Sequence, residues 1–225
     1  MKNKEKKNKK GIFIIVTLSI ILTVSIIFNI FLFNKKNIIE YKNDENIIFF
    51  GDSITEGYRL DKYFPKKNVV NKGISGNRTT DLVNRIDKDV YEYNPSKTLI
   101  LIGINDLAME TEKEDILENI QLIINGLQIN RKNSEIYVES VYPVNKDLII
   151  EKNTSFAYTL DNVKVMNLNN DLKKMCEEND ITYIDVYSKL IDDNNNLKSN
   201  YTYDGVHLTD LGYLKITSVL KDYVK

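Results

Sequence analysis

From residue 47 onward, short apolar runs alternate with longer segments in which apolar residues recur three or four positions apart. A short apolar run predicts a strand that is buried on both faces, and the wider spacing predicts an amphipathic helix. Repeated strand–helix–strand units favour a parallel sheet with helices on both faces, because each connection must return to the end where the next strand begins. The sequence therefore predicts an α/β sandwich.

The apolar pattern also places the elements along the chain. The predicted strands are residues 47–50, a strand that begins at 69, and residues 98–102, 136–141 and 181–186. The predicted helices are residues 79–93, a segment with an apolar stripe from 116 to 127, residues 162–178, and a last helix from 209 to the C-terminus. Thr111 and Glu114 have the spacing of a capping box, which would start the second of these helices. Residues 143–160 show no clear period and are interpreted as a long loop, a kind of segment that is often functional.

Residues 11–33 form the longest apolar run, with 23 residues and no charge. A helix of this length reaches about 35 Å, which is enough to cross a bilayer with some tilt. Six lysines precede the run and two follow it closely, a distribution that predicts a cytoplasmic N-terminus. No small-residue cleavage site ends the run, so an uncleaved anchor is favoured over a signal peptide. We expect a cell-membrane protein with a basic cytoplasmic tail at 1–10, a transmembrane anchor at 11–33, a stalk at 34–45 and an extracytoplasmic domain at 46–225.

The chain is nearly neutral, but its charge is unevenly distributed. Residues 1–36 hold eight lysines and one glutamate, which leaves 23 basic and 31 acidic residues, a net charge of −8, for the rest. An acidic domain without a basic stripe argues against nucleic-acid binding. Cys176 is the only cysteine, so neither an intrachain disulfide nor a cysteine-based metal cluster is possible. Its position on the apolar side of a predicted helix indicates a buried thiol.

Four short segments hold the candidate chemistry: GDS at 51–53, GISG at 73–76, GIND at 103–106 and DGVH at 204–207. The first three each follow a predicted strand, so they gather at the carboxyl edge of the sheet, where ligands of such sheets bind. The fourth precedes the last helix and can fold back to the same edge. Backbone N–H groups between the second segment and the helix at 79 could bind an anion.

Taken alone, each segment has an ordinary structural explanation as a turn, a helix cap or a surface histidine. Together they contain a serine, N–H donors from glycine and asparagine, a histidine and an aspartate. These groups can act as nucleophile, oxyanion donors, base and orienting acid in acyl transfer through a serine. His207 is the only histidine in the chain, so it has no competitor of its type as the base.

In this order and at this spacing, the four segments resemble the motifs of the SGNH hydrolases, also called GDSL-type esterases and lipases, over about residues 46–225. The resemblance implies a flavodoxin-like three-layer α/β/α sandwich with a mainly parallel sheet, here preceded by one transmembrane helix. It also implies a Ser53 nucleophile, a His207 base and an orienting Asp204. The N–H groups of Ser53 and Gly76 and the amide of Asn105 would bind the oxyanion. No metal or organic cofactor is implied.

Two motifs depart slightly from the pattern of that family. The first reads GDSI where GDSL is usual, and the third reads GIND where GTND is frequent. Neither change removes an atom with an implied role. The neighbouring acids Asp52 and Asp106 are expected to have structural hydrogen-bonding roles only.

The expected function is ester hydrolysis by an anchored enzyme that faces outward, and in particular removal of O-acetyl groups from cell-envelope glycan. The alternatives are a lysophospholipase or thioesterase acting on lipid, an O-acyltransferase, and a catalytically silent glycan-binding module. The expected partners are an ester substrate, either acetylated glycan or lipid, and the membrane through residues 11–33, with no nucleic acid. Phe156 and Tyr158 in the predicted loop could shape a lipid pocket.

Overall fold

The computed structural model describes residues 17–18, 21–31, 46–154 and 159–225. Residues 17–18 and 21–31 are helical, and the contacts group Asp44–Lys225 into a compact unit separate from the one that ends at Asn43. Much of the predicted span at 11–33, and all of the predicted tail and stalk, lie outside the described residues, as do Phe156 and Tyr158. Within the described residues, no helix combines the length and the apolar character that crossing a bilayer requires.

Five parallel strands form one sheet in the order β2-β1-β3-β4-β5. Their bounds are Ile47–Gly51 for β1, Val69–Gly73 for β2, Lys97–Leu101 for β3, Glu135–Glu139 for β4 and Thr182–Ile184 for β5. The register pairs Gly51 with Gly73 on one side and with Leu101 on the other, so these three strands end at one level. The order is that of flavodoxin-like sheets. The predicted parallel sheet is confirmed.

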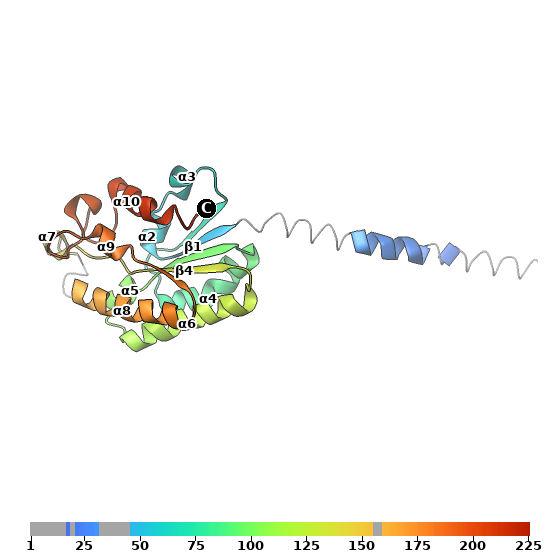
Figure 1. The fold of residues 1–225 in the computed structure, drawn as a ribbon, viewed down its shortest axis with the longest axis horizontal. Coiled ribbons are helices and arrows are strands. Elements are labelled where there is room, and N and C mark those ends of the chain that lie inside the picture. Colours follow the sequence, from blue (N-terminus) through green and yellow to red (C-terminus); the bar gives the residue numbers. More distant parts are fainter. Residues whose placement is uncertain (1–16, 19–20, 32–45, 155–158) are drawn as a thin grey trace, which may run out of the picture. The chain divides into compact units, whose positions relative to one another are not determined.

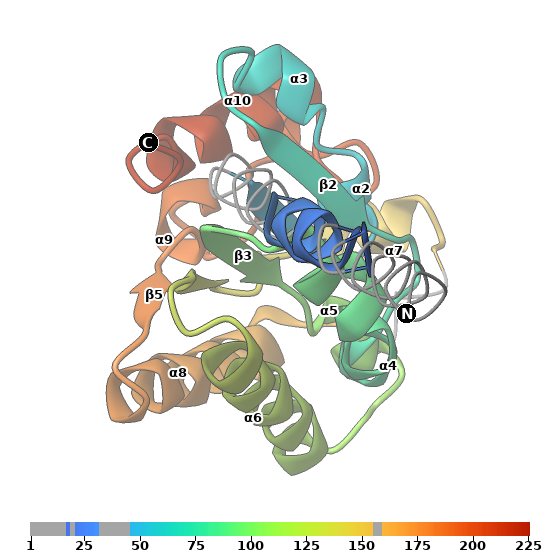
Figure 2. The ribbon, with the colours of Figure 1, turned by 90° about the vertical axis from the view of Figure 1, so that its right-hand side faces the viewer.

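Helices cover both faces of this sheet (Figure 1 and Figure 2). One face carries α4 (Thr79–Asp89), α6 (Lys113–Asn130) and α8 (Asn162–Glu178). The other carries α3 (Leu60–Tyr63), α9 (Tyr187–Leu190) and α10 (Asp210–Leu220). The short helices α2 (Ser53–Glu56) and α5 (Ile104–Ala108) begin at the ends of β1 and β3, and 3-10 turns lie at Tyr91–Tyr93 and Ser199–Tyr201. The predicted three-layer α/β/α sandwich is therefore confirmed for the described domain.

Apolar burial holds the helices on the sheet, as α6 illustrates. It buries Ile116, Ile120, Ile123, Ile124 and Leu127 along one face, at the spacing that the sequence predicted. Complete burial of a side chain of this size stabilises the fold by about 1.5–3 kcal/mol. The thiol of Cys176 on α8 is fully buried, which confirms that expectation.

The predicted capping box at the start of α6 is wrong. The helix begins at Lys113 after Glu112, and no side chain forms a capping hydrogen bond there. The reason is that the N–H of Thr111 donates to the carbonyl oxygen of Asp106 at 3.0 Å, so Thr111 still belongs to the turn that closes α5.

The prediction of a continuous loop at 143–160 is also corrected, because α7 (Lys146–Glu151) lies within it. Asn145 caps this helix by accepting a hydrogen bond from the N–H of Leu148 at 2.9 Å. A helix of six residues is too short to produce a visible apolar period. The last helix, α10, ends at Leu220 rather than at the C-terminus.

Candidate active site

Ser53 lies at the carboxyl edge of the sheet because it is the first residue of α2, two positions after β1 ends. Asp52 is the N-cap of this helix, and its Oδ1 accepts a hydrogen bond from the N–H of Ile54 at 2.9 Å. On the other side, the hydroxyl of Tyr213 from α10 donates to the carbonyl oxygen of Ile54 at 2.8 Å. Hydrogen bonds of Asp52 and Tyr213 with the backbone thus hold the short helix that presents the serine.

Asp204 and His207 come from the turn that leads into α10. Asp204 Oδ1 accepts hydrogen bonds from the N–H groups of Val206 at 2.9 Å and His207 at 2.8 Å. Its Oδ2 lies 2.6 Å from His207 Nδ1, and His207 Nε2 lies 2.9 Å from Ser53 Oγ. The structure therefore brings the three side chains into one hydrogen-bonded chain, although 154 positions separate the serine from the histidine.

The charges of the three hydrogen-bonded side chains follow from their contacts. The hydrogen bond with Asp204 raises the pKa of His207, against burial, which acts to lower it. Burial acts to raise the pKa of Asp204, but the hydrogen bonds from the His207 ring and from the backbone N–H groups outweigh it and leave that pKa lowered. An ionised carboxylate only accepts, so the hydrogen of the neutral imidazole lies on Nδ1 and the lone pair on Nε2 faces Ser53.

Gly76 and Asn105 are connected through Asn77, which follows Gly76 in the sequence and accepts a hydrogen bond from Asn105. Gly76 has a φ of +79°, a left-handed conformation that favours glycine, in a turn closed by the N–H of Asn77 and the carbonyl oxygen of Ile74 at 3.2 Å. The Asn105 amide nitrogen donates to the carbonyl oxygen of Asn77 at 2.9 Å, which leaves its second hydrogen available. No acceptor among the described residues takes the N–H of Gly76. Both groups can therefore donate to an anion.

Two of the backbone donors at the start of α4, where the sequence predicts an anion site, are already occupied by carboxylates of the chain, so an anion there is left with other donors such as the N–H of Gly76 before the helix. Asp106 accepts from the N–H of Thr79 at 3.0 Å and from its hydroxyl at 2.7 Å. Asp81 accepts from the N–H of Arg78 at 2.8 Å. The structural roles expected for Asp52 and Asp106 are confirmed by these contacts and by the helix cap at Asp52.

Two further residues near the site were missed from the sequence. The ring of Tyr203 stacks beside that of His207, with centroids 5.9 Å apart and planes 14° apart, and Tyr203 is 60% exposed. Its position directly before Asp204 is the sequence signal that places Tyr203 near the site. Glu139, at the end of β4, is buried and accepts a hydrogen bond from the Tyr142 hydroxyl at 2.5 Å. Burial raises the pKa of Glu139 to about 7 and that of Asp52 to about 7.

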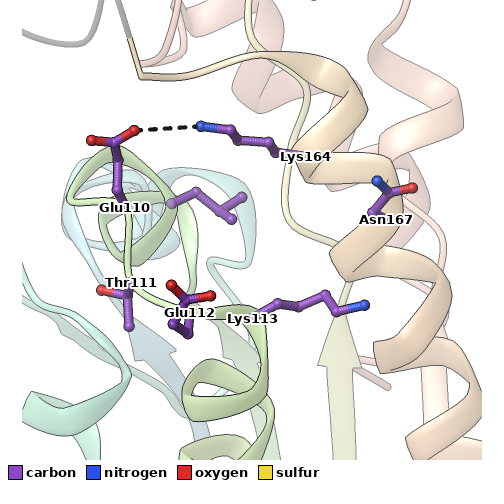
Figure 3. A pocket seen from close by; sticks show the side chains of 7 residues that line it. Glu110, Thr111, Glu112, Lys113, Lys164 and Asn167 are labelled. Carbon is purple, nitrogen blue, oxygen red and sulfur yellow. Dashed lines mark ion pairs between the residues drawn. The ribbon is translucent and has the colours of Figure 1, made fainter.

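A separate cavity of about 340 Å³ lies between the start of α6 and α8 (Figure 3). Lys164 and Glu110 face each other across its mouth, 3.9 Å apart. Its lining does not include Ser53 or His207, so it is distinct from the hydrogen-bonded chain. Across the described residues, no three histidine, cysteine or acidic side chains gather as metal ligands would.

Comparison with known proteins places this geometry in a family. An acetylxylan esterase from Geobacillus stearothermophilus is 32% identical over 119 residues, covering 39% of this chain and 54% of that protein, so the chain spans about half the length of this relative. A Streptococcus pneumoniae structure, provisionally described as a platelet activating factor, has 30% identity and a TM-score of 0.76, covering 91% of this chain and 99% of its own. A GDSL-like lipase from Bacteroides thetaiotaomicron has 25% identity and a TM-score of 0.69, covering 81% and 89%.

The family profile extends over most of the chain. It matches residues 49–215, a range that contains all four motifs. The match confirms the resemblance on which the sequence interpretation was based. The chain belongs to the GDSL-like lipase/acylhydrolase family.

Proposed function

We propose that this chain is a serine esterase in which Ser53 is the nucleophile, His207 the general base and Asp204 the residue that orients the histidine. The carrying observation is the continuous hydrogen-bonded chain, with 2.9 Å between Ser53 Oγ and His207 Nε2 and 2.6 Å between His207 Nδ1 and Asp204 Oδ2. The first distance is within the range over which a general base takes a proton, and the second is that of a hydrogen bond that fixes the imidazole ring. The raised pKa of His207 also suits a base that must hold this proton during acyl transfer.

The reaction then proceeds in two halves. Ser53 Oγ bonds to the ester carbonyl carbon while its proton moves to His207 Nε2, and the carbonyl oxygen becomes an oxyanion. Collapse of this intermediate breaks the bond to the alcohol, which leaves with the proton from His207. Water next loses a proton to His207 and attacks the carbonyl carbon of the acyl-serine. The bond to Ser53 Oγ then breaks, His207 returns the proton to Oγ, and the acid is released. The N–H groups of Ser53 and Gly76 and the Asn105 amide bind the oxyanion in both halves.

We further propose that the substrate is a short-chain ester on a glycan, with an O-acetyl group as the acyl part. Three observations support this. The acetylxylan esterase is a relative at 32% identity. The side chains of His207 and Asp204 are 26% and 24% exposed, so a bulky chain can reach them. Tyr203 presents an exposed ring beside the histidine, where it can pack against the flat face of a sugar.

We also propose that residues 11–33 anchor the enzyme in the cell membrane, with its N-terminus in the cytoplasm and residues 46–225 outside. In support, the large apolar side chains described between Leu18 and Phe31 are 51–63% exposed, all around the helix. Lysines flank the run asymmetrically, six before and two after it. Protease added to intact cells should degrade the folded domain. Protection of that domain, or its recovery in the soluble fraction, would contradict this topology.

A panel of esters tests the catalytic proposal. The full chain in detergent and its Ser53→Ala variant are assayed with 4-nitrophenyl esters of increasing acyl length and with acetylated xylo-oligosaccharides. We expect hydrolysis of acetyl esters that disappears in Ser53→Ala. Preference for long acyl chains would instead favour a lipid acylhydrolase, and acetyl transfer to an added sugar would favour an acyltransferase. If a fluorophosphonate fails to label Ser53 and no ester is cleaved, a silent glycan-binding module is the better interpretation.

A further inference from the structure

Arg85 on α4 is a nearly buried cation whose hydrogen bonds lead to the candidate active site. Its side chain is 14% exposed, and the guanidinium lies 4.5 Å from the centre of the ring of Phe50 in the interior strand β1. A buried arginine must commit its donors to acceptors, because an unpaired charge in this position would be costly. The hydrogen-bond partners of Arg85 therefore indicate its role.

Three of those partners are parts of the backbone and loop that present the reacting groups. Nη2 donates to the carbonyl oxygen of Gly51 at 2.8 Å and to that of Lys72 at 3.0 Å, at the ends of β1 and β2. Nε donates to the side-chain oxygen of Asn77 at 2.7 Å. One rigid planar group thus joins the strand that leads to Ser53, the strand that leads to the Gly76 turn, and the turn itself.

The connection extends from this turn to the third motif. Asn77 follows Gly76 directly, and its carbonyl oxygen accepts the hydrogen bond from the Asn105 amide at 2.9 Å. Asn77 therefore binds Arg85 with its side chain and Asn105 with its backbone. A displacement of Asn77 would turn both the N–H of Gly76 and the amide of Asn105.

We propose that Arg85 is a positioning residue for the oxyanion-binding groups, acting through Asn77 without touching the substrate. The inference rests on the proposed esterase function, in which Gly76 and Asn105 bind the oxyanion. Donors that are already aimed at the developing charge need no reorganisation during the reaction, and this pre-alignment is the source of their effect on rate. The guanidinium supplies it by tying the turn to the two strand ends.

The competing explanation is that Arg85 only stabilises the fold by pairing with Asp89. Nη1 donates to Asp89 Oδ2 at 2.8 Å, and Lys72 binds the other oxygen of the same carboxylate at 3.2 Å. The two roles use different atoms of one guanidinium, so substitutions can separate them. Asn77→Ala removes only the contact with the turn, and Asp89→Asn removes only the charge on the opposite side.

The experiment measures kcat, KM, the pH profile and Tm for Asn77→Ala, Arg85→Lys and the matched control Asp89→Asn, with 4-nitrophenyl acetate and the full chain. We expect kcat to fall about 10- to 100-fold in Asn77→Ala and Arg85→Lys, the range that a misplacement near 1 Å produces. Lysine keeps the charge but lacks the fork of donors. KM should stay the same, because the oxyanion-binding groups act on the transition state. The acid midpoint of the pH profile should also stay the same, because His207 and Asp204 are untouched. Asp89→Asn should lower Tm with kcat within about twofold of the natural chain.

The outcomes separate this inference from the proposed function. If Asn77→Ala keeps kcat within about threefold of the natural chain while Ser53→Ala is inactive, the positioning role is overturned and the esterase proposal stands. If Asp89→Asn loses as much kcat as Arg85→Lys, the ion pair explains the effect and the positioning role is also overturned. If Ser53→Ala remains active, both proposals fail. Asn77 is half-buried in an otherwise exposed turn, so its variant remains informative even where an Arg85 variant does not fold.

Discussion

Asp204 offers a sharp test of the proposed mechanism, because its two carboxylate oxygens have separate partners. Oδ1 accepts from the N–H groups of Val206 and His207 at 2.9 and 2.8 Å, and Oδ2 lies 2.6 Å from His207 Nδ1. In an Asp204→Asn variant, the amide oxygen must keep the two backbone hydrogen bonds, since an NH₂ group there would face two donors. The NH₂ group is therefore directed at Nδ1.

This orientation forces the imidazole into the opposite tautomer. Nδ1 has to accept from the amide, so the ring hydrogen moves to Nε2, which faces Ser53 Oγ at 2.9 Å. Nε2 then has no lone pair for the serine proton. We expect kcat to fall about 10⁴-fold, as the corresponding substitution does in serine proteases, which equals about 5.5 kcal/mol of lost transition-state stabilisation.

The assay is hydrolysis of 4-nitrophenyl acetate, with thermal unfolding as the control for folding. Asp204→Asn keeps both backbone hydrogen bonds, so its Tm should stay within a few degrees of that of the natural chain. Asp204→Ala is the matched comparison, because it leaves two half-buried N–H groups without an acceptor and should lose about 1 kcal/mol of stability for each. Retention of more than about a tenth of the natural kcat in Asp204→Asn would refute the tautomer argument.

Three further predictions concern His207, Glu139 and Gly103. Because the hydrogen bond with Asp204 raises the pKa of His207, kcat/KM should fall on the acid side with a midpoint above the ordinary value of 6.5, and a pH–rate profile with a lower midpoint would contradict this. Burial raises the pKa of Glu139 from 4.5 to about 7, so this carboxyl keeps its proton to a higher pH in the folded state than in the unfolded state. The protonated carboxyl therefore contributes to stability fully below about pH 4.5, and this contribution is lost as the pH rises toward 7. Glu139→Gln should reduce this fall in the free energy of unfolding measured by urea denaturation, leaving the part that comes from Asp52, and an unchanged slope would show that Glu139 does not contribute. Gly103→Ala should destabilise the fold by about 1–3 kcal/mol, because φ there is +125° and a Cβ would lie 3.2 Å from Val141. Tm and kcat should both drop, since the strain shifts α5 and with it Asn105. A variant with the natural Tm and kcat would contradict this strain.

The layers and the meeting of the motifs could be predicted from the sequence for physical reasons. An apolar stripe such as that of α6 has no partner other than the sheet, so periodicity alone assigns its buried face. Parallel strands end at one edge, so Ser53 after β1 and Asn105 after β3 were expected near each other. Periodicity does not predict the position of His207, because the turn that precedes α10 carries no periodic signal.

Arg85 and Glu139 could not be predicted in the same way. An arginine within an amphipathic helix normally indicates a solvated face, and a glutamate at a strand end normally indicates exposure. Arg85 is mostly buried, and two backbone carbonyl oxygens near the strand ends, those of Gly51 and Lys72, accept hydrogen bonds from it. Such acceptors exist only after the sheet has formed, and no side-chain pattern encodes them.

The depth at which each group lies explains how an open site can keep an ordered geometry. His207 and Asp204 are about a quarter exposed, whereas Asp52 and Asp106, which hold the serine helix and the start of α4, are each 1% exposed. Water competes with hydrogen bonds at the surface but not with those beneath it, so the supports remain strong where the reacting groups are accessible. In the proposed mechanism, binding of a large substrate and alignment of the catalytic groups therefore depend on different residues. Substitutions at the exposed rim, such as Tyr203→Ala, should act mainly on KM, and substitutions at the buried supports should act mainly on kcat, because alignment contributes only to the transition state.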